Sequence, residues 1–378
     1  MSEAVHIDVT NLLREPIRTG IQRVERELIR HWPDNSRLVP VIAGRQHFQV
    51  LPREVLAGLV DGTPVRRHFP FARSLRAAPG RLRLLNPELF FDPGRARLYT
   101  ELIRAGGGWI GWLLYDFLPW LAPNFFHPGA STVGMPFLAA LRDVPHVAHI
   151  SAQTRREYET RIMHGHGREG PVVSLGGDGL GLARQEFSPD RRLFVALGTL
   201  EPRKNVAAIL EAFGELWARG HQAELVVIGM LRSGTTREAE LLHRFRDEKR
   251  LRYIGTADDA TVRAVLGGSR ALVCATEAEG FGLPPLEALH AGIPVIATAM
   301  PSLDMLPAHG QIRLAEATPP AIAAAVETML DDAVASRLWQ EAAGLPVRSW
   351  RDFARDVADW ALAGPTTCKA RASGGQGP

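Results

Sequence analysis

The sequence predicts an α/β protein built from two doubly wound domains. Short apolar runs alternate with segments of helical periodicity along most of the 378 residues. This alternation is typical of parallel sheets with helices on both faces. It occurs twice, with a break at 187–190, where the sequence reads Phe-Ser-Pro-Asp. The length is sufficient for two domains of ordinary size.

The first half of the chain contains short apolar runs that we interpret as strands and periodic segments that we interpret as helices. We expect strands at 5–10, 39–43, 113–116 and 144–150, and helices at 21–32 and 154–163. A polar loop at 14–20 separates the first strand from the first helix. We assign this half, residues 1–187, to an N-terminal domain.

The second half repeats the pattern more regularly, and we assign residues 188–347 to a C-terminal domain. We expect strands at 192–197, 223–229, 251–254 and 271–275, and helices at 206–219, 237–248, 258–266 and 286–291. Asp258 and Asp259 precede the third of these helices and are interpreted as its cap. A last helix with apolar residues at helical spacing follows within 348–363, and the glycine-containing tail 364–378 is expected to be disordered.

Composition excludes several classes of protein. The net charge of +3 is small, and no basic motif with interleaved aromatics is present, so we expect no nucleic-acid partner. The two cysteines, Cys274 and Cys368, argue against a disulfide framework, and no metal-ligand spacing occurs. We see no secretory signal and no apolar run near 18 residues, and we expect a cytoplasmic location with no bound metal.

The strongest local signal is the segment that follows the strand expected at 271–275. It reads Glu279-Gly-Phe-Gly-Leu-Pro-Pro-Leu-Glu287 and leads into a helix that Gly292 stops. Glycines in such a loop let the backbone approach a ligand with no Cβ in the way. Glu279 lies on the loop and Glu287 in the first turns of the helix, so we expect both to face one pocket and accept hydrogen bonds from hydroxyls.

A second loop carries two adjacent cations. It begins at Gly198, where a strand ends, and places Arg203 and Lys204 just before the helix expected at 206–219. The helix dipole favours anions at that end, which indicates an anion site. Fixed cations there would stabilise negative charge that develops in a transition state more than they stabilise the ground state.

Together these two segments resemble the retaining glycosyltransferases of the GT-B fold, especially family 4, whose E-x7-E signature and diphosphate loop occur in this order. The resemblance runs from about 193 to 299 and is weaker before it. It implies two Rossmann-like domains that face each other across a cleft, with the acceptor on the N-terminal domain and a nucleotide-sugar donor on the C-terminal domain. It also implies that the last helix crosses back to the N-terminal domain.

The resemblance implies a role for each motif residue. Glu287 would accept from the ribose hydroxyls, and Glu279 would lie beside the transferred sugar. Arg203 and Lys204 would hold the diphosphate in place of a metal ion. The backbone N–H groups that would contact the sugar or the phosphate are those of Gly280, Phe281, Gly282 and Leu283.

The first domain carries weaker signals. Gly20 opens the first helix and resembles a glycine loop that closes over the diphosphate, although a plain turn would also explain it. Asp116 either faces the acceptor or caps the turn after its strand. Many relatives have histidine before this aspartate, where the present chain has Tyr115. A loop at 302–304, Ser-Leu-Asp, places its acid one position early, which leaves contacts to the nucleotide open there.

The function implied by the resemblance is metal-independent transfer of a hexosyl group, mannosyl-like and with retention. The donor would be a GDP- or UDP-linked sugar, with no further cofactor, and the acceptor a saccharide or lipid-linked saccharide in surface polysaccharide biosynthesis. One alternative is a non-catalytic sugar-nucleotide-binding or scaffold protein of the same fold. Another is an epimerase or phosphorylase of that fold.

A basic segment of the first domain suggests a further partner. Between residues 61 and 88 no acid occurs, apolar residues up to Leu85 are interleaved, and six arginines are present. These are Arg66, Arg67, Arg73, Arg76, Arg81 and Arg83. The segment either contacts an anionic membrane surface, which would place the protein on the inner face of the membrane, or is a solvated basic loop.

Overall fold

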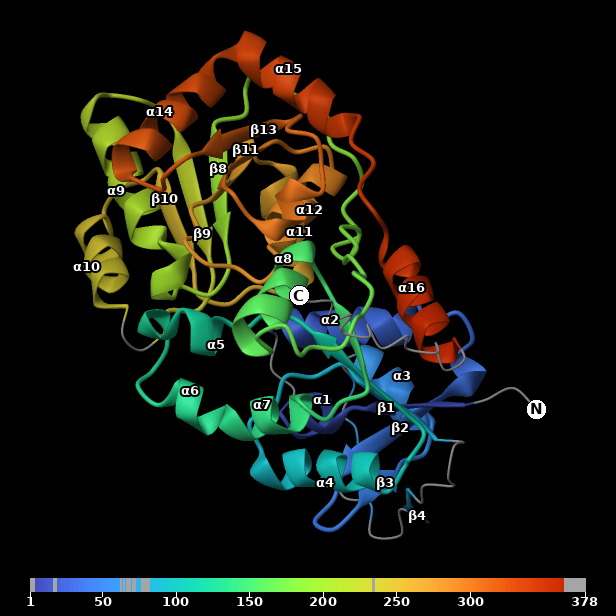
Figure 1. Cartoon of the computed structure of the whole chain (residues 1–378). Coiled ribbons are helices and arrows are strands. Elements are labelled where there is room, and N and C mark those ends of the chain that lie inside the picture. The colour runs from blue at the N-terminus through green and yellow to red at the C-terminus, as the bar shows by residue number, and fades with distance from the viewer. Residues whose placement is uncertain are drawn as a thin grey trace, which may run out of the picture.

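Two α/β domains stand one above the other in the computed structural model (Figure 1). The structure describes residues 4–15, 19–61, 63, 65, 69, 73–75, 82–232 and 235–363. The N-terminal half forms the lower domain in this view, coloured blue to green, and the C-terminal half forms the upper one, coloured yellow-green to red. Each domain has a largely or wholly parallel sheet with helices packed on it, so the predicted α/β fold class is confirmed.

The first sheet has the strand order β4-β3-β2-β1-β5-β6-β7 within the described residues. Its strands are β1 (Val5–Asp8), β2 (Leu38–Ala43), β3 (Phe48–Val50), β4 (Arg73–Ser74), β5 (Arg83–Asn86), β6 (Trp109–Leu114) and β7 (His146–His149). β1 pairs in parallel with β2 and β5, and β6 pairs in parallel with β5 and β7. β3 and β4 extend the sheet beyond β2 in antiparallel register.

Helices of varied length cover this sheet. They are α1 (Thr10–Arg14), α2 (Gly20–Arg30), α3 (Glu54–Asp61), α4 (Pro93–Arg104), α5 (Leu118–Leu121), α6 (Ala130–Val133), α7 (Met135–Leu141) and α8 (Ala152–Glu157). α8 continues into a wider helical segment, Tyr158–Ile162, so the helix expected at 154–163 is present with a change of winding near its middle. The polar loop expected at 14–20 is preceded by α1, which the apolar periodicity did not reveal.

The second sheet is parallel throughout, in the order β10-β9-β8-β11-β12-β13. Its strands are β8 (Leu193–Leu197), β9 (Glu224–Ile228), β10 (Leu251–Ile254), β11 (Ala271–Cys274), β12 (Val295–Thr298) and β13 (Gln311–Leu314). Every residue of β11 and β12 is buried, as expected for strands covered on both faces.

The helices of the second domain follow its strands in regular alternation. They are η4 (Pro202–Lys204), α9 (Val206–Ala218), α10 (Thr236–Arg244), α11 (Asp259–Gly267), α12 (Leu283–His290), α13 (Pro301–Asp304), α14 (Pro319–Leu330) and α15 (Asp332–Ala343). The Asp258 side chain accepts from the Thr261 N–H at 2.8 Å, which confirms that it caps α11. α12 begins three residues before the expected start, because Pro284 and Pro285 fit the first turn, where a missing N–H leaves no bond unmade.

The last helix, α16 (Trp350–Leu362), lies against the first domain (Figure 1). It packs on α2, and its Trp350 and Phe353 side chains are fully buried. Ser349 begins the helix with a reciprocal capping box to Asp352. The last described helix therefore packs on the N-terminal domain. The contact between α16 and α2 links the two domains.

The structure describes part of the basic segment at 66–85. Its end forms β5, which lies in the middle of the first sheet between β1 and β6. Leu84 and Leu85 are fully buried there, and the Arg83 guanidinium donates to the Ala361 carbonyl at 2.8 Å. Leu75 and Leu82 are also buried. These residues are part of the protein core, and contact of the segment with a membrane stays a prediction. Arg66, Arg67, Arg76 and Arg81 lie outside the described residues.

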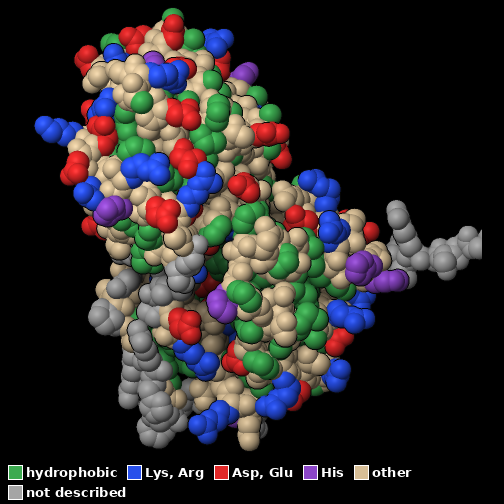
Figure 2. Space-filling model, turned by 90° about the vertical axis from the view of Figure 1, so that its left-hand side faces the viewer, with side chains coloured by type: hydrophobic (Ala, Val, Ile, Leu, Met, Phe, Trp, Pro, Cys, Tyr) green, Lys and Arg blue, Asp and Glu red, His purple; other side chains and the backbone are tan. Residues whose placement is uncertain are grey.

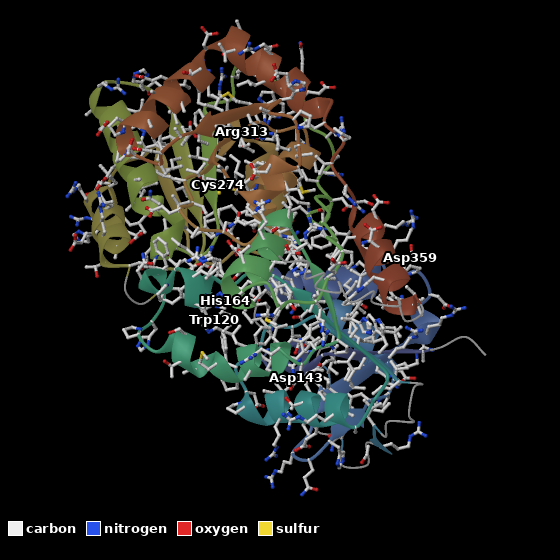
Figure 3. All side chains as sticks on the ribbon, in the orientation of Figure 1. Trp120, Asp143, His164, Cys274, Arg313 and Asp359 are labelled. Carbon is white, nitrogen blue, oxygen red and sulfur yellow. The ribbon has the colours of Figure 1, made fainter. Side chains whose placement is uncertain are left out.

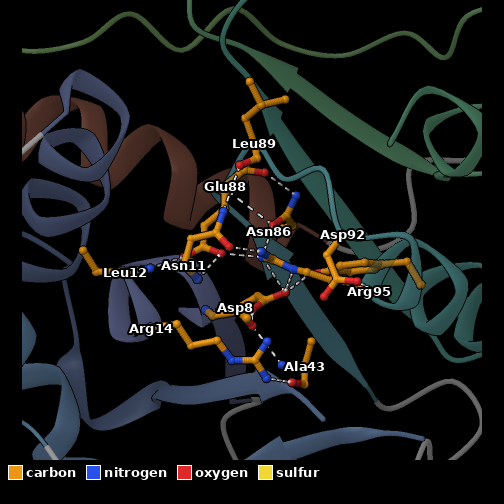
Figure 4. A network of polar contacts seen from close by, with 12 residues as sticks. Asp8, Asn11, Leu12, Arg14, Ala43, Asn86, Glu88, Leu89, Asp92 and Arg95 are labelled. Atoms are coloured by element: carbon orange, nitrogen blue, oxygen red, sulfur yellow. Dashed lines mark hydrogen bonds and ion pairs between the residues drawn. The ribbon is translucent and has the colours of Figure 1, made fainter. Parts of the chain in front are cut away.

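A buried polar network joins the ends of β1 and β5 to α4 (Figure 4). Arg95 Nη2 lies 2.8 Å from Asp8 Oδ2 and 2.5 Å from Glu88 Oε2. The same guanidinium donates to Asn86 Oδ1, and the Tyr99 hydroxyl donates to Asp8 at 2.7 Å. The Arg95 side chain is only 1% exposed. The network therefore depends on one buried cation that two carboxylates share.

Substituting that cation should destabilise the fold strongly. We expect Arg95→Ala to lower the free energy of unfolding by about 3–5 kcal/mol, because it leaves the Asp8 and Glu88 carboxylates buried without the cation that they share. Arg97→Ala on the same helix is the matched control, since Arg97 is 64% exposed and its pair with Glu101 spans 3.6 Å. We expect the control to change the free energy by less than about 0.5 kcal/mol. Denaturant unfolding measures both, and equal effects would contradict a structural role for the network.

Candidate functional site

The candidate site lies where the strand order of the second sheet reverses. β9 follows β8 along the chain on one side of the sheet, whereas β11 pairs with β8 on the other side. The loops that leave β8 and β11 therefore meet at the carboxyl edge of the sheet, a position where open α/β sheets bind ligands. These are the two loops that carry the sequence motifs. In Figure 3, Cys274 marks the end of β11 in the upper domain, and Trp120 marks α5 of the lower domain opposite it.

Both predicted cations contact the first glutamate of the motif. Lys204 Nζ forms an ion pair with Glu279 Oε2, and Arg203 Nη1 lies 3.2 Å from the same oxygen. Arg203 also donates to the Ala278 carbonyl at 3.0 Å and to Glu201 Oε1 at 2.7 Å. The side chains of Arg203, Lys204 and Glu279 are each 14–15% exposed. The structure thus brings together three of the predicted site residues in one half-buried ionic cluster.

The charges within this cluster shift the pKa values of Glu279 and Arg203. Burial opposes ionisation of Glu279, but Lys204 and Arg203 outweigh it, so the pKa of Glu279 lies below its ordinary value. Burial likewise opposes the charge of Arg203, and Glu279, Glu201 and Asp116 outweigh it and raise its pKa. Arg203 is therefore charged and paired with Glu201 and Glu279, and Lys204 pairs with Glu279. A diphosphate that binds here would replace these carboxylates as the acceptor of the N–H groups of Arg203 and Lys204.

The glycine loop after Glu279 has a shape that only glycine fits at one position. Gly282 has φ +97°, and a Cβ there would collide with the Met300 sulfur. Ser302, which lies outside the loop in sequence, stabilises it by two hydrogen bonds. Its hydroxyl donates to the Gly282 carbonyl at 2.8 Å, and its N–H donates to the Phe281 carbonyl at 3.0 Å. The loop and the first N–H groups of α12 are thus fixed before any ligand binds.

Other predicted donor-site residues lie close to this loop or around it. Phe281 is 4% exposed, so its side chain belongs to the core and only its backbone is available to a ligand. Gly198 has φ +139°, and a Cβ there would lie 3.9 Å from the Lys204 side chain. The acid of the 302–304 loop, Asp304, is exposed. The function of that loop in this structure is the support that Ser302 gives to Gly282.

Asp116 approaches the glycine loop from the first domain. Its Oδ1 accepts from the Leu118 N–H at 3.1 Å, so it caps the turn after β6. It also contacts the second domain, because a Cβ built on Gly280 would lie 2.7 Å from Asp116 Oδ2. Both alternatives that the sequence left open, a turn cap and a residue facing the site, therefore agree with its position.

Burial raises the pKa of Asp116 to about 6, against the opposing effects of the Leu118 N–H and of Arg203. The folded protein then binds a proton on Asp116 more tightly than the unfolded chain does. Stability consequently falls as pH rises from the ordinary aspartate pKa, near 4, to about 6, and the loss is complete above that pH. Asp116 thus destabilises the fold at neutral pH.

We expect Asp116→Asn to stabilise the protein at pH 7.5 and to leave its stability nearly unchanged at pH 4. The carboxyl is only partly enclosed, so we expect a gain of about 1–2 kcal/mol at the higher pH. Thermal unfolding of both proteins between pH 4 and 8 measures the difference. A difference that does not grow with pH would show that ionised Asp116 is not destabilising.

Tyr115 does not stand in for the histidine of related proteins. Its side chain points into the first domain, where the hydroxyl donates to the Pro87 carbonyl at 2.7 Å and only 5% of the residue is exposed. Burial raises its pKa well above the ordinary tyrosine value. It therefore has no proton to exchange at the site near neutral pH.

The second glutamate of the motif faces the first domain. Glu287 is 3% exposed, and its Oε1 lies 2.9 Å from Arg23 Nη2 of α2, at an angle outside that of a hydrogen bond. Gly20 is the first residue of the same helix, which Thr19 caps by accepting from the Gln22 N–H. Glu279 and Glu287 pair with cations of different domains, and the expectation that both face one pocket stays a prediction. Sequence reasoning did not identify Arg23, and its only signal was its place one turn after Gly20.

Figure 2 shows a hollow between the two domains on the face that carries α5 and α6. Apolar side chains gather on the first domain beside it. Among the described residues, no group of His, Cys, Asp and Glu is placed to hold a metal ion. No helix in the described part of the chain is both long and apolar enough to cross a bilayer.

Sequence comparison finds a family match within the second domain. Residues 182–344 match the family of glycosyl transferases group 1. The chain is 24% identical over 357 residues to the serotype-specific mannosyltransferase WbdA of Escherichia coli, a match that covers 86% of this chain and 42% of WbdA. It is 32% identical over 108 residues to the O-antigen chain mannosyltransferase B of Escherichia coli, 28% of each chain. The chain thus spans less than half the length of WbdA.

Solved structures share the whole two-domain arrangement. The HepE protein of Anabaena, in complex with UDP and glucose, matches with a TM-score of 0.62 at 14% identity, over 94% of this chain and 98% of that one. Sucrose-phosphate synthase from Thermosynechococcus elongatus matches with a TM-score of 0.58 at 17% identity, over 95% and 96% of the two chains. These neighbours are glycosyltransferases of the GT-B fold, and the similarity confirms that fold for this chain.

Proposed function

We propose that this chain, whose residues 182–344 belong to the group 1 glycosyl transferase family, transfers a hexosyl group from a nucleoside diphosphate sugar to a saccharide acceptor. We further propose that the sugar is mannosyl-like, that its anomeric configuration is retained, and that no metal ion takes part. The acceptor is a free or lipid-linked saccharide of a surface polysaccharide, and the reaction takes place in the cytoplasm.

The observation that carries the proposal is the cluster of Arg203, Lys204 and Glu279 at the switch point of the second sheet. Its two cations lie just before α9, which has 13 residues and whose dipole also favours an anion. The preformed glycine loop adds backbone N–H groups beside them. Such a site fits the diphosphate and the adjoining sugar of a nucleotide sugar.

The chemistry follows from these charges. The bond between the sugar C1 and the diphosphate oxygen breaks, the acceptor oxygen bonds to C1 on the same face, and the acceptor proton passes to the released diphosphate. Arg203 and Lys204 stabilise the negative charge that accumulates on the leaving group, because they are fixed in a half-buried site before the reaction begins. Glu279, released from Lys204 when the diphosphate binds, would face the sugar as its positive charge develops. Asp116 lies on the acceptor side of the same loop.

The choice of sugar and acceptor rests on the relatives. WbdA and the O-antigen chain enzyme are mannosyltransferases by name, and the second is named for a surface polysaccharide. HepE is described in complex with UDP and glucose, which supports a nucleotide-sugar donor without deciding the base. We therefore propose GDP- or UDP-linked donors.

A thermal-shift screen with GDP-, UDP-, ADP- and dTDP-linked sugars tests the donor, since a ligand that binds only the folded state raises the apparent stability. We expect one base to give the largest shift. Incubation of that donor with a mannose-containing acceptor should then yield product whose new linkage has the donor's anomeric configuration by proton NMR. Stabilisation without any transfer would favour a non-catalytic sugar-nucleotide-binding protein, and the absence of both would overturn the proposal.

A further inference from the structure

Arg23 is a side chain of the first domain that reaches the donor half of the molecule. It lies on α2, one turn after Gly20, and its Nη2 is 2.9 Å from Glu287 Oε1 on α12. The Arg23 side chain is 24% exposed and that of Glu287 is 2% exposed. This ion pair bridges the two domains at a buried carboxylate.

The position of Arg23 is defined by its surroundings. A Cβ built on Gly179 would lie 3.2 Å from Arg23 Nη2 and would also collide with the Trp350 ring nitrogen. The neighbouring Asp178 accepts from the Trp350 N–H at 2.6 Å, and this hydrogen bond attaches the segment around Gly179 to the first residue of α16. The guanidinium therefore occupies a slot between Gly179 and Glu287 that a larger residue at 179 would fill.

Arg23 also acts on the pKa of Glu287, in the direction opposite to that of several nearby acids. Burial raises the pKa of Glu287 to about 7, and Arg23 lowers it. Asp259 of α11, Glu27 of α2 and Asp178 all raise it further. Within the described residues, Glu287 has no ion pair other than that with Arg23. The charge of Glu287 near neutral pH thus depends on this one contact.

A ribose presents two hydroxyls, and an ionised carboxylate accepts from both, whereas a neutral carboxyl loses acceptor capacity and gains a donor. Arg23 contacts only Oε1 and therefore does not occupy the whole carboxylate. We propose that Arg23 is a positioning residue of the donor site, which holds Glu287 in the ionised form that accepts from the ribose hydroxyls. This inference rests on the proposed function, in which Glu287 contacts the ribose.

The test is the pH dependence of nucleotide binding, with GDP and UDP as probes. Calorimetric titrations between pH 5.5 and 9 compare the wild type with Arg23→Gln, Arg23→Lys and Glu287→Gln. We expect the wild-type affinity to fall as pH falls through about 7, because Glu287 gains a proton. Arg23→Gln should shift this profile upward by about one pH unit, which weakens binding about fivefold at pH 7, approaches a tenfold loss below pH 6 and changes binding little at pH 9. Arg23→Lys should restore the wild-type profile in large part.

The remaining outcomes separate the competing explanations. If Arg23→Gln weakens binding equally at every pH, Arg23 is only a structural contact, and if it strengthens binding, Arg23 competes with the ribose; either result overturns the proposal. Glu287→Gln should bind weakly with no pH dependence in this range, and a persisting profile would assign the titration to another group. Arg237→Gln, a 65% exposed arginine paired with Glu211, is the control. Wild-type protein that binds neither nucleotide at any pH would remove the proposed function itself, whereas a wild-type profile unchanged by Arg23→Gln removes only the role of Arg23.

Discussion

Replacement of Lys204 by alanine is expected to lower kcat for glycosyl transfer by about ten- to a hundred-fold. A hydrogen bond to a charged group contributes about 1.5–3 kcal/mol, and each 1.4 kcal/mol in the barrier changes the rate about tenfold. The loss should appear mainly in kcat, because charge on the diphosphate increases as the glycosidic bond breaks. Steady-state kinetics with the donor found by thermal shift measures it.

Lys204 is the better choice for this experiment than Arg203. Arg203 also donates to the Ala278 carbonyl and pairs with Glu201, so its removal would disturb the loop as well as the charge. Arg237→Ala is the matched control, since it removes an exposed cation from the same domain. We expect no change in kcat for the control. A Lys204→Ala enzyme with wild-type kcat would show that Lys204 does not stabilise the leaving group.

Replacement of Gly280 by alanine should lower kcat/KM by about a hundred-fold. The added Cβ would lie 2.7 Å from Asp116 Oδ2 and 2.8 Å from Asp116 Cβ. Because Cβ is fixed to the backbone, the two domains must move apart or the glycine loop must shift. A displacement of about 1 Å from the reactive geometry reduces the rate by about this factor.

Thermal unfolding of the same variant distinguishes this effect from loss of the fold. We expect only a small fall in the unfolding temperature, since the clash lies at the surface of contact between the domains and not inside either sheet. Gly268→Ala is the control: Gly268 is exposed, and the nearest atom to its added Cβ, the Ala264 oxygen, is 3.6 Å away. Full activity in Gly280→Ala would mean that the contact between Asp116 and Gly280 is absent during the reaction.

In the second domain, β8 to β11 and the helices that follow them could be predicted, because each of these strands is a short apolar run followed by a helical segment. β12, β13, α14 and α15 were not identified. The first domain was harder. β5 lies in an arginine-rich segment that we interpreted as a membrane-contacting or solvated loop, although Leu84 and Leu85 are fully buried. Strand β4 is two residues long and lies at the sheet edge, where no apolar pattern is required. Local periodicity cannot identify strands that depend mainly on their neighbours in the sheet.

The candidate site likewise has residues that were predicted and contacts that were not. Arg203, Lys204 and Glu279 lie in loops that leave adjacent parallel strands. The strand pattern does not show that β11 pairs with β8, and it was the resemblance of both loops to one family that assigned them to one site. The contacts of Arg23 with Glu287 and of Ser302 with Gly282 join residues distant in sequence, and nothing local predicts them. The direction of a side chain at a strand end is also a tertiary property.

The central claim is that the Arg203–Lys204 loop and the glycine loop bind the diphosphate of a nucleotide sugar. Calorimetric titration of GDP and UDP into the wild type and Lys204→Ala at pH 8 tests it most directly. We predict that one of the two nucleotides binds the wild type, and that Lys204→Ala binds it about tenfold more weakly or worse, which corresponds to about 1.4 kcal/mol. Equal affinities in the two proteins would contradict the claim.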